Sequence, residues 1–285
     1  MIATTPVVTR FAPSPTGYLH LGHGYAAVFA AARARETGGR FLLRIEDIDR
    51  GRCRPEYERA AIEDLTWLGL EWEQPARRQS DHMADYARAI DALEALGVLY
   101  PCFCTRAEIA AEVAAAARAP HGPDGPRYPS TCRRLGESER AKRIESGRAY
   151  ALRLDAQEAA DIAGALTWTD LEKGEVVVRP EAIGDVVIAR KDTPTSYHLA
   201  VTVDDQLQDV TLVTRGDDLF HATDVHRLLQ ALLGYATPAY RHHALLTRSD
   251  GRRLAKRDGA ETLRELRAAG LGPDDVRALM PAEGL

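Results

Sequence analysis

The stretch Arg-Phe-Ala-Pro-Ser-Pro-Thr-Gly-Tyr-Leu-His-Leu-Gly-His occupies residues 10–23 and decides how the fold is interpreted. It starts at the end of an apolar run over 7–11, is broken by two prolines and a glycine, and leads into an Ala-rich segment at 24–35. A strand, a tight loop and a helix in this order bind nucleotide phosphates through free N–H groups and the helix dipole. Because neither a GK[ST] nor a GxGxxG pattern is present, His20 and His23 are the specific donors expected there.

Two apolar runs predict short buried strands on either side of that helix, at residues 7–11 and 40–45. Together with the helix at 24–35 they form a βαβ unit, which is typical of a parallel, doubly wound α/β sheet. Two more helices are expected at 55–68 and 81–96, where apolar residues recur every third or fourth position and a glycine follows.

The character of the chain changes after residue 100. An alanine run at 110–119 is typical of an ordinary helix, and Pro-His-Gly-Pro-Asp-Gly-Pro at 120–126 indicates a loop that neither a helix nor a strand would tolerate. Strand patterns return further along, at residues 149–154, 175–179 and 185–190. We therefore expect a nucleotide-binding fold that is interrupted by an insertion.

The composition excludes several classes of function. The chain has 285 residues, 45% of them hydrophobic, and no apolar run long enough to cross a bilayer. A net charge of −5 is not that of a protein that binds polyanions over its whole surface. RNA contact would need local basic patches, such as 133–143 or 248–257, for which a solvated surface is the alternative interpretation. The N-terminal residues lack the features of a signal peptide, so we expect a cytoplasmic protein.

Five motif blocks follow one another along most of the chain. The first is His20-Leu21-Gly22-His23, and the second is Arg44-Ile45-Glu46-Asp47-Ile48-Asp49. The third joins Tyr197-His198-Leu199-Ala200 to Val203-Asp204-Asp205, the fourth is Thr214-Arg215-Gly216, and the last is Arg253-Leu254-Ala255-Lys256-Arg257. Each block is weak alone, but their order and spacing closely resemble the class I glutamyl-type aminoacyl-tRNA synthetases, with their HIGH and KMSKS-type motifs.

This resemblance implies a Rossmann-like class I synthetase catalytic domain with a zinc-bearing α/β insertion and a short helical C-terminal tail. It divides a single catalytic unit into the first half of the nucleotide-binding fold, an insertion with a tRNA-contacting surface, the second half of the fold, and the KMSKS-type loop with the tail. The corresponding segments are 1–99, 100–190, 191–245 and 246–285.

Activation of an amino acid places negative charge on the phosphate oxygens of ATP, so fixed cationic and N–H donors are expected. The resemblance assigns ATP binding and catalysis to His20 and His23, and to Lys256 on the KMSKS-type loop. It also assigns ATP binding to Gly22, which would let adenine approach the backbone closely. Mg²⁺ would accompany the ATP. Similar loops usually carry a serine where this chain has Ala255, which predicts slower or differently gated turnover.

Selecting glutamate requires a cation for its side-chain carboxylate and an anion for its ammonium group. The resemblance assigns Arg10 and Arg215 to the carboxylate and Glu46 to the ammonium. Arg215 directly follows an expected strand at 210–213, and a salt bridge to an aspartate at 217–218 is its alternative role. The glutamate-binding set implied by the resemblance is Arg10, Phe11, Ala12, Pro13, Ser14, Glu46, Tyr197 and Arg215.

Three of the four cysteines fall in the insertion: Cys102, Cys104 and Cys132. Three thiolates suit Zn²⁺, but a closed structural site needs a fourth ligand. Relatives of this type use a tyrosine, which corresponds to Tyr128, whereas His121 is the chemically easier choice. Reduced cysteines without a metal are the third possibility, and we interpret Cys53 as a surface or half-buried thiol.

Only 29 residues follow Lys256, which we interpret as leaving no room for an anticodon-binding domain. The short paralogues in this family attach L-glutamate to the cyclopentenediol of queuosine at the wobble position of tRNA(Asp). We therefore expect ATP, L-glutamate and queuosine-containing tRNA(Asp) as partners, no membrane, and a monomer. The alternatives are a truncated enzyme that charges a tRNA 3′ end, a non-catalytic tRNA-binding paralogue, and a small nucleotidyltransferase with the same HxGH motif.

Overall fold

The first half of a parallel sheet is formed by β1 (Val8–Phe11), β2 (Arg40–Ile45) and β3 (Glu73–Arg78), in the order β1-β2-β3. The connections are α1 (Leu21–Glu36) and α2 (Pro55–Trp67). This computed structural model describes residues 5–115, 121–122, 125–126, 128–246 and 261–282. The βαβ unit predicted around the HxGH motif is therefore confirmed.

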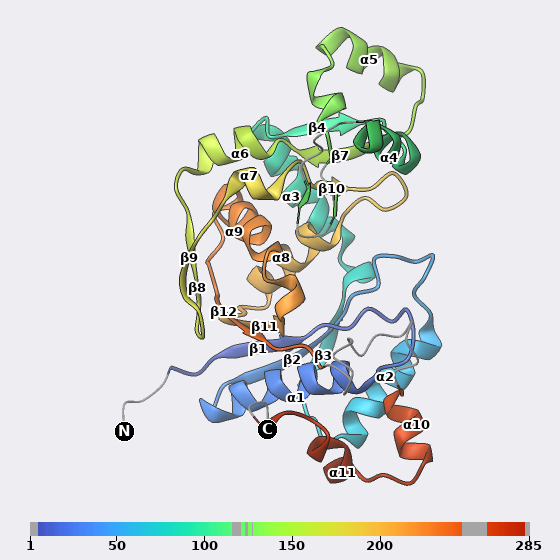
Figure 1. Cartoon of the computed structure of the whole chain (residues 1–285), viewed down its shortest axis with the longest axis vertical. Helices are drawn as coiled ribbons and strands as arrows, with labels where there is room; N and C mark the ends of the chain where they lie inside the picture. Colours follow the sequence, from blue (N-terminus) through green and yellow to red (C-terminus); the bar gives the residue numbers. More distant parts are fainter. Residues whose placement is uncertain (1–4, 116–120, 123–124, 127, 247–260, 283–285) are drawn as a thin grey trace.

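The second half of the sheet contains β11 (Leu212–Gly216) and β12 (Ala239–His243), which are parallel, with β8 (Thr167–Asp170) parallel to β12 and β9 (Gly174–Val177) antiparallel to β8. Strand β1 lies beside β11. The N–H of Thr211 donates to the carbonyl of Val8 at 3.0 Å, and the N–H of Val8 donates to Oγ1 of Thr211 at 2.9 Å. The Rossmann-like α/β fold expected from the sequence is confirmed (Figure 1).

Helix α1 is apolar almost all round because it is covered on two sides. Ten of its 16 residues are buried, and its outer side packs against the C-terminal helices α10 (Leu263–Ala268) and α11 (Pro273–Ala278). At Gly24 an added Cβ would lie only 3.2 Å from side-chain atoms of Leu263 and Met280. Small residues therefore let the helical tail approach α1 closely, as Figure 1 shows.

A small antiparallel sheet lies at the far end of the molecule, in the order β10-β7-β4. Its strands are β4 (Leu99–Cys102), β7 (Ala151–Leu154) and β10 (Val187–Ala189). The remaining elements there are α4 (Arg106–Ala115), β5 (His121–Gly122), β6 (Gly125–Pro126), η2 (Thr131–Arg134), α5 (Glu137–Glu145), α6 (Ala156–Ala163) and α7 (Pro180–Ile183). The β8–β9 hairpin falls within the expected insertion of 100–190 but pairs with β12 of the main sheet, so the segment is not one continuous structural unit.

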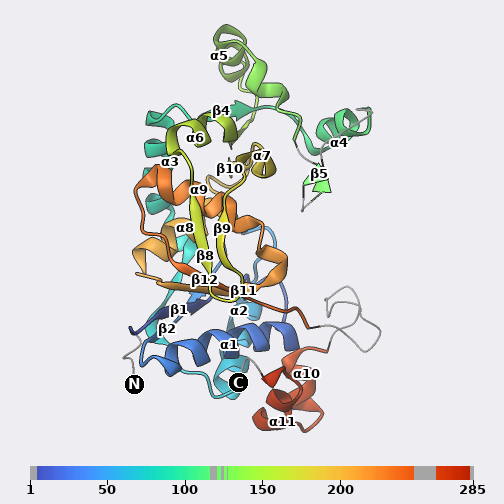
Figure 2. The same cartoon turned by 60° about the vertical axis from the view of Figure 1, so that its left-hand side comes forward.

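Between the two sheets lies a helical layer. It consists of α3 (Met83–Ala95), α8 (Tyr197–Leu207) and α9 (Ala222–Leu233), with the short turns η1 (Gln79–Asp81) and η3 (Asp217–Leu219) nearby. These helices share one core with α6 and with the small sheet. Figure 2 shows the layer in the middle of the molecule, directly above β11 and β12.

Most element predictions agree with the structure, and two do not. The helices expected at 55–68 and 81–96 are α2 and α3, and the glycines after them have positive φ. The expected loop at 120–126 contains the short β5–β6 pair, since proline is tolerated at the edge of a two-stranded pair. The strand expected at 210–213 runs from Leu212 to Gly216, so Arg215 lies within it. Residues 116–119 of the alanine run lie outside the described residues.

No helix in the described ranges is both long and apolar enough to span a membrane.

Candidate active site

The N-terminus of α1 brings together the two histidines of the HxGH motif. His20 is the N-cap: its Nδ1 accepts a hydrogen bond from the N–H of Gly22 at 3.1 Å, and its backbone N–H donates to Nδ1 of His23 at 3.2 Å. The ring centroids are 3.8 Å apart. A Cβ on Gly22 would lie 3.1 Å from Cε1 of His20, so the capping ring favours a glycine there. Both imidazoles sit at the positive end of the helix dipole, where anions bind.

The loop between β1 and α1 is attached to the end of β2. The N–H of Glu46 donates to the carbonyl of Pro13 at 3.0 Å. Ser14 is exposed and Ala12 is half-buried, so a ligand could reach both. The side chain of Phe11 is different: it is buried and packs in the core around α1. Any contact of Phe11 with a ligand would therefore involve its backbone.

Arg10 and Glu46 belong to one buried network of charges. Arg10 donates to Asp205 through Nε at 2.9 Å and through Nη2 at 3.3 Å, and its Nη1 donates to the carbonyl of Thr214 at 3.2 Å. Arg44 is fully buried; its Nη1 lies 2.8 Å from Asp205 Oδ1 and its Nη2 lies 3.3 Å from Glu46 Oε1. Asp205 therefore links the two arginines, and Arg44 links Asp205 to Glu46.

Glu46 and Asp205, two carboxylates of this network, have pKa values that are shifted in opposite directions. Burial raises the pKa of Glu46, and the nearby charges of Arg44 and Arg10 do not offset it. Burial also acts to raise the pKa of Asp205, but the charges and hydrogen bonds of Arg10 and Arg44 outweigh it, so that pKa is held below its usual range. Asp205 is therefore a fixed counter-ion, whereas Glu46 gains from any further cation that comes near it.

Arg215 is buried without an acidic partner. Its Nε donates to Nε2 of His242 at 3.1 Å, its Nη1 contacts Nδ1 of His226 at 3.1 Å, and its Nη2 donates to the hydroxyl of Thr223. Among the residues that the structure describes, no carboxylate lies within ion-pair distance of this guanidinium. The alternative of a salt bridge to an aspartate at 217–218 is therefore not realised.

Tyr197 lies next to these groups at the first turn of α8. Its ring centroid is 5.7 Å from that of His226. Burial raises the pKa of its hydroxyl, and the charges of Arg215, Glu46 and Arg10 all act on it. The structure thus brings together the four charged or phenolic side chains that the resemblance assigned to glutamate. Lys256, by contrast, lies outside the described residues, as does Ala255.

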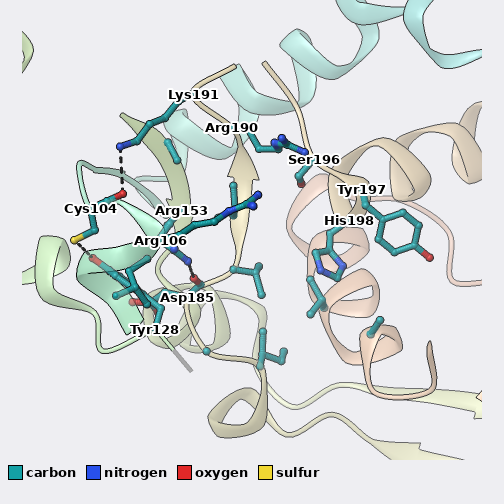
Figure 3. Close-up of a pocket in the computed structure, with 18 of the residues that line it drawn as sticks. Cys104, Arg106, Tyr128, Arg153, Asp185, Arg190, Lys191, Ser196, Tyr197 and His198 are labelled. Atoms are coloured by element: carbon teal, nitrogen blue, oxygen red, sulfur yellow. Dashed lines mark hydrogen bonds between the residues drawn. The ribbon is translucent and has the colours of Figure 1, made fainter. Parts of the chain in front are cut away.

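A cavity of about 1200 Å³ opens beside Tyr197. Figure 3 shows Ser196, Tyr197 and His198 on one side of it, and Cys104 and Tyr128 on the other. It therefore connects the start of α8 with the cysteine-bearing part of the small sheet. Its size suits a ligand considerably larger than an amino acid.

Cys102, Cys104 and Cys132 converge on one point, with their Sγ atoms all within 4.8 Å of one another. The hydroxyl of Tyr128 lies 3.4 Å from Sγ of Cys102 and 3.6 Å from Sγ of Cys104. Tetrahedral Zn²⁺ with bonds of about 2.3 Å separates sulfur ligands by about 3.8 Å. The donor set and its spacing therefore fit a zinc ion. The side chain of His121 lies outside what the structure describes, and Cys53 is half-buried elsewhere.

Sequence reasoning gave no role to Asp205, Arg44, His226, His242 or Asp170. Asp205 and Arg44 lie within two of the motif blocks given above. A charged residue within an otherwise apolar strand or helix is the pattern that could have identified them. The other three come from separate elements and meet only through strand register and helix packing, so a single sequence holds no sign of their contact.

Comparison with known proteins shows the family of this chain. The family model "tRNA synthetases class I (E and Q), catalytic domain" matches residues 6–278. The chain is 48% identical to the Glutamyl-Q tRNA(Asp) synthetase of Rhodobacter capsulatus, covering 96% of this chain and 99% of that protein. It is 46% identical to the protein of the same name from Symbiobacterium thermophilum, covering 94% and 83%.

A solved structure shares the fold as well. The glutamate tRNA ligase of Elizabethkingia meningosepticum, in complex with its amino acid, superimposes with a TM-score of 0.75 at 30% identity, over 89% of this chain. The match spans about half the length of that protein, 52%. The chain belongs to the class I tRNA synthetases (E and Q) and is a ligase of that family.

Proposed function

We propose that this chain activates L-glutamate with ATP and transfers it to the cyclopentenediol of queuosine at the wobble position of tRNA(Asp). In the first step a carboxylate oxygen of glutamate attacks the α-phosphorus of ATP, and pyrophosphate leaves. In the second step a hydroxyl of queuosine attacks the carbonyl carbon of glutamyl-adenylate; AMP leaves, and the hydroxyl proton is released.

The observation that carries the proposal is the uncompensated charge of Arg215, which acts on Tyr197 together with the charge of Glu46. Arg215 has three neutral partners, and only one oxygen of Glu46 accepts a hydrogen bond within the described residues, from Arg44. An amino acid with a carboxylate side chain would supply an anion to Arg215 and an ammonium to Glu46. Arg10 is already paired with Asp205, so we assign it to holding the pocket and to the α-carboxylate side rather than to side-chain selection.

For ATP we assign phosphate contacts to His20 and His23 at the helix N-terminus, and to Lys256. Mg²⁺ bound with ATP would neutralise part of the phosphate charge. These groups stabilise charge that develops on phosphate oxygens, so they act mainly on the chemical step.

The acceptor is inferred from the relatives' names and from the cavity beside Tyr197. Two relatives at 46–48% identity are named Glutamyl-Q tRNA(Asp) synthetase, and the cavity has room for a modified nucleoside. We further assign Cys102, Cys104, Tyr128 and Cys132 to a structural Zn²⁺, which would fix the wall of the cavity opposite α8. We expect the enzyme to act as a cytoplasmic monomer.

The test uses labelled glutamate, ATP and tRNA(Asp) that lacks its 3′-terminal nucleotides, isolated from cells with and without queuosine. Label on the truncated, queuosine-containing tRNA alone supports modification of the anticodon base. Label that appears only on intact tRNA, whatever its queuosine content, would identify an enzyme that charges the 3′ end, as the glutamate tRNA ligase similarity allows. Without any transfer to either tRNA, the proposal fails.

A further inference from the structure

Five side chains from five elements form a continuous line of hydrogen bonds through the buried Arg215. Strand register places Arg215 of β11 opposite His242 of β12, and Tyr240 of β12 opposite Asp170 of β8. Nδ1 of His242 lies 2.7 Å from Oδ2 of Asp170. On the other side, Nε2 of His226 on α9 lies 3.2 Å from Nδ1 of His198 on α8.

The direction of every hydrogen bond in this line follows from Arg215, because a guanidinium only donates. Nε2 of His242 must then accept, so its proton is on Nδ1 and is donated to Asp170. Nδ1 of His226 must also accept, so its proton is on Nε2 and is donated to Nδ1 of His198. The proton of His198 is left on Nε2. Each ring is thereby restricted to one neutral tautomer.

We propose that Asp170, His242 and His226 are positioning residues, which hold the guanidinium of Arg215 in place and fix His198 as a donor, and so select a carboxylate over a carboxamide. The inference rests on the proposed function, in which Arg215 receives the side chain of glutamate. The carboxamide of glutamine has a donor NH₂ group, which would face donors and remain unpaired. A site that leaves a buried polar group unpaired rejects that ligand strongly.

The surroundings keep these rings neutral and in place. Burial, and then the charge of Arg215, lower the pKa of His242 to about 4 and that of His226 well below its ordinary value. Burial and Arg215 likewise lower the pKa of His198 to about 4, and His198 lines the cavity shown in Figure 3. The ring of His242 also packs against Phe220, with centroids 5.0 Å apart.

The substitution Asp170→Asn tests this inference with almost no change in shape. Oδ1 of Asp170 accepts from the N–H groups of Glu172 and Lys173, which would hold the asparagine oxygen. The NH₂ group would then face the ring Nδ1 and the backbone N–H of His242, which both contact Oδ2 in the native protein. The His242 proton would then move to Nε2 and oppose the Nε–H of Arg215. We expect the ratio of kcat/KM for glutamate over glutamine, in ATP–pyrophosphate exchange, to fall on the order of 100-fold. The KM for ATP should not change.

Two further variants separate this effect from a loss of folding. His242→Gln keeps an acceptor oxygen within reach of Arg215, so the selectivity ratio should stay within about tenfold of the native protein. Asp64→Asn changes another buried aspartate, on α2 and outside the line, and should leave the ratio unaltered. A ratio for Asp170→Asn equal to that of Asp64→Asn would overturn the inference.

The tautomers can also be measured without activity. Long-range ¹H–¹⁵N NMR of the histidine rings should give protonation at Nδ1 for His242 and at Nε2 for His226 and His198. Protonation of His226 at Nδ1, or a cationic His242 at neutral pH, refutes the inference directly. If the native protein catalyses no glutamate-dependent exchange, the proposed function fails. The tautomer measurement would still decide whether the hydrogen bonds between Asp170 and His198 have the directions given above.

Discussion

Replacing Arg215 by methionine should remove glutamate activation while leaving the fold intact. The substitution deletes the buried guanidinium that no carboxylate of the described chain neutralises. Truncating one partner of a buried hydrogen-bonded charge pair costs about 2–5 kcal/mol. At about 1.4 kcal/mol per factor of ten, this is a loss of roughly 30- to 4000-fold in kcat/KM for glutamate. We expect the upper part of that range, because the substrate carboxylate is the counter-ion that Arg215 lacks.

The stability of the free protein should change little. Methionine leaves the acceptors of His226, His242 and Thr223 without a donor, but it also removes an uncompensated buried charge, and the two effects oppose each other. The assay is glutamate-dependent ATP–pyrophosphate exchange, with thermal unfolding as the check on folding. Arg241→Met, on the same sheet but paired with Glu172, serves as the matched control. A kcat/KM for Arg215→Met within threefold of that control would refute the assignment of Arg215.

Three other outcomes are expected. Lys256→Ala should lower kcat for activation with little change in the KM for glutamate, measured by single-turnover kinetics; a large rise in that KM would contradict its assignment to phosphate. The purified protein should contain about one zinc per chain by mass spectrometry; Cys132→Ser should lose it and Cys53→Ser should keep it, and a metal-free native protein would exclude the site. Because burial raises the pKa of Glu46 above its ordinary value of 4.5, kcat/KM for glutamate should fall on acidification at a higher pH than a solvent-exposed glutamate would give. Protonated Glu46 cannot accept the ammonium group, so a profile that is flat down to the pH of unfolding would remove Glu46 from that role.

Local sequence patterns predicted most of the strands and helices of the nucleotide-binding fold. The boundaries of β2 are those expected, and α2 ends within a residue of the expected position, because apolar periodicity, proline and glycine act locally. The expected strand ended at Val213, before Arg215, whereas β11 continues to Gly216. Here neighbouring imidazoles and a hydroxyl satisfy the guanidinium inside the protein, which no local pattern indicates.

The candidate site likewise contains residues that local motifs could identify and contacts that they could not. Glu46 and His20 stand in contiguous motifs, and their roles could be predicted from resemblance. The partners of Arg10 could not, because Asp205 lies 195 residues away and meets it only when β1 is placed beside the second half of the sheet. The cysteine cluster was predicted only in part. The residue types indicated a metal site, but the proximity of Tyr128 to the three cysteines comes from the structure.

The sharing of Asp205 between Arg10 and Arg44 has a consequence for biosynthesis. Arg44 precedes its counter-ion by 161 residues, so at about 5–20 residues per second a ribosome adds Asp205 on the order of ten seconds later. Until then the nascent β1–α1–β2 unit holds the two positive charges of Arg10 and Arg44, which it would have to bury with Glu46 as the carboxylate nearby but without Asp205. This early segment should therefore remain unfolded or bound by a chaperone during translation, and the sheet should close in a single late step with high contact order.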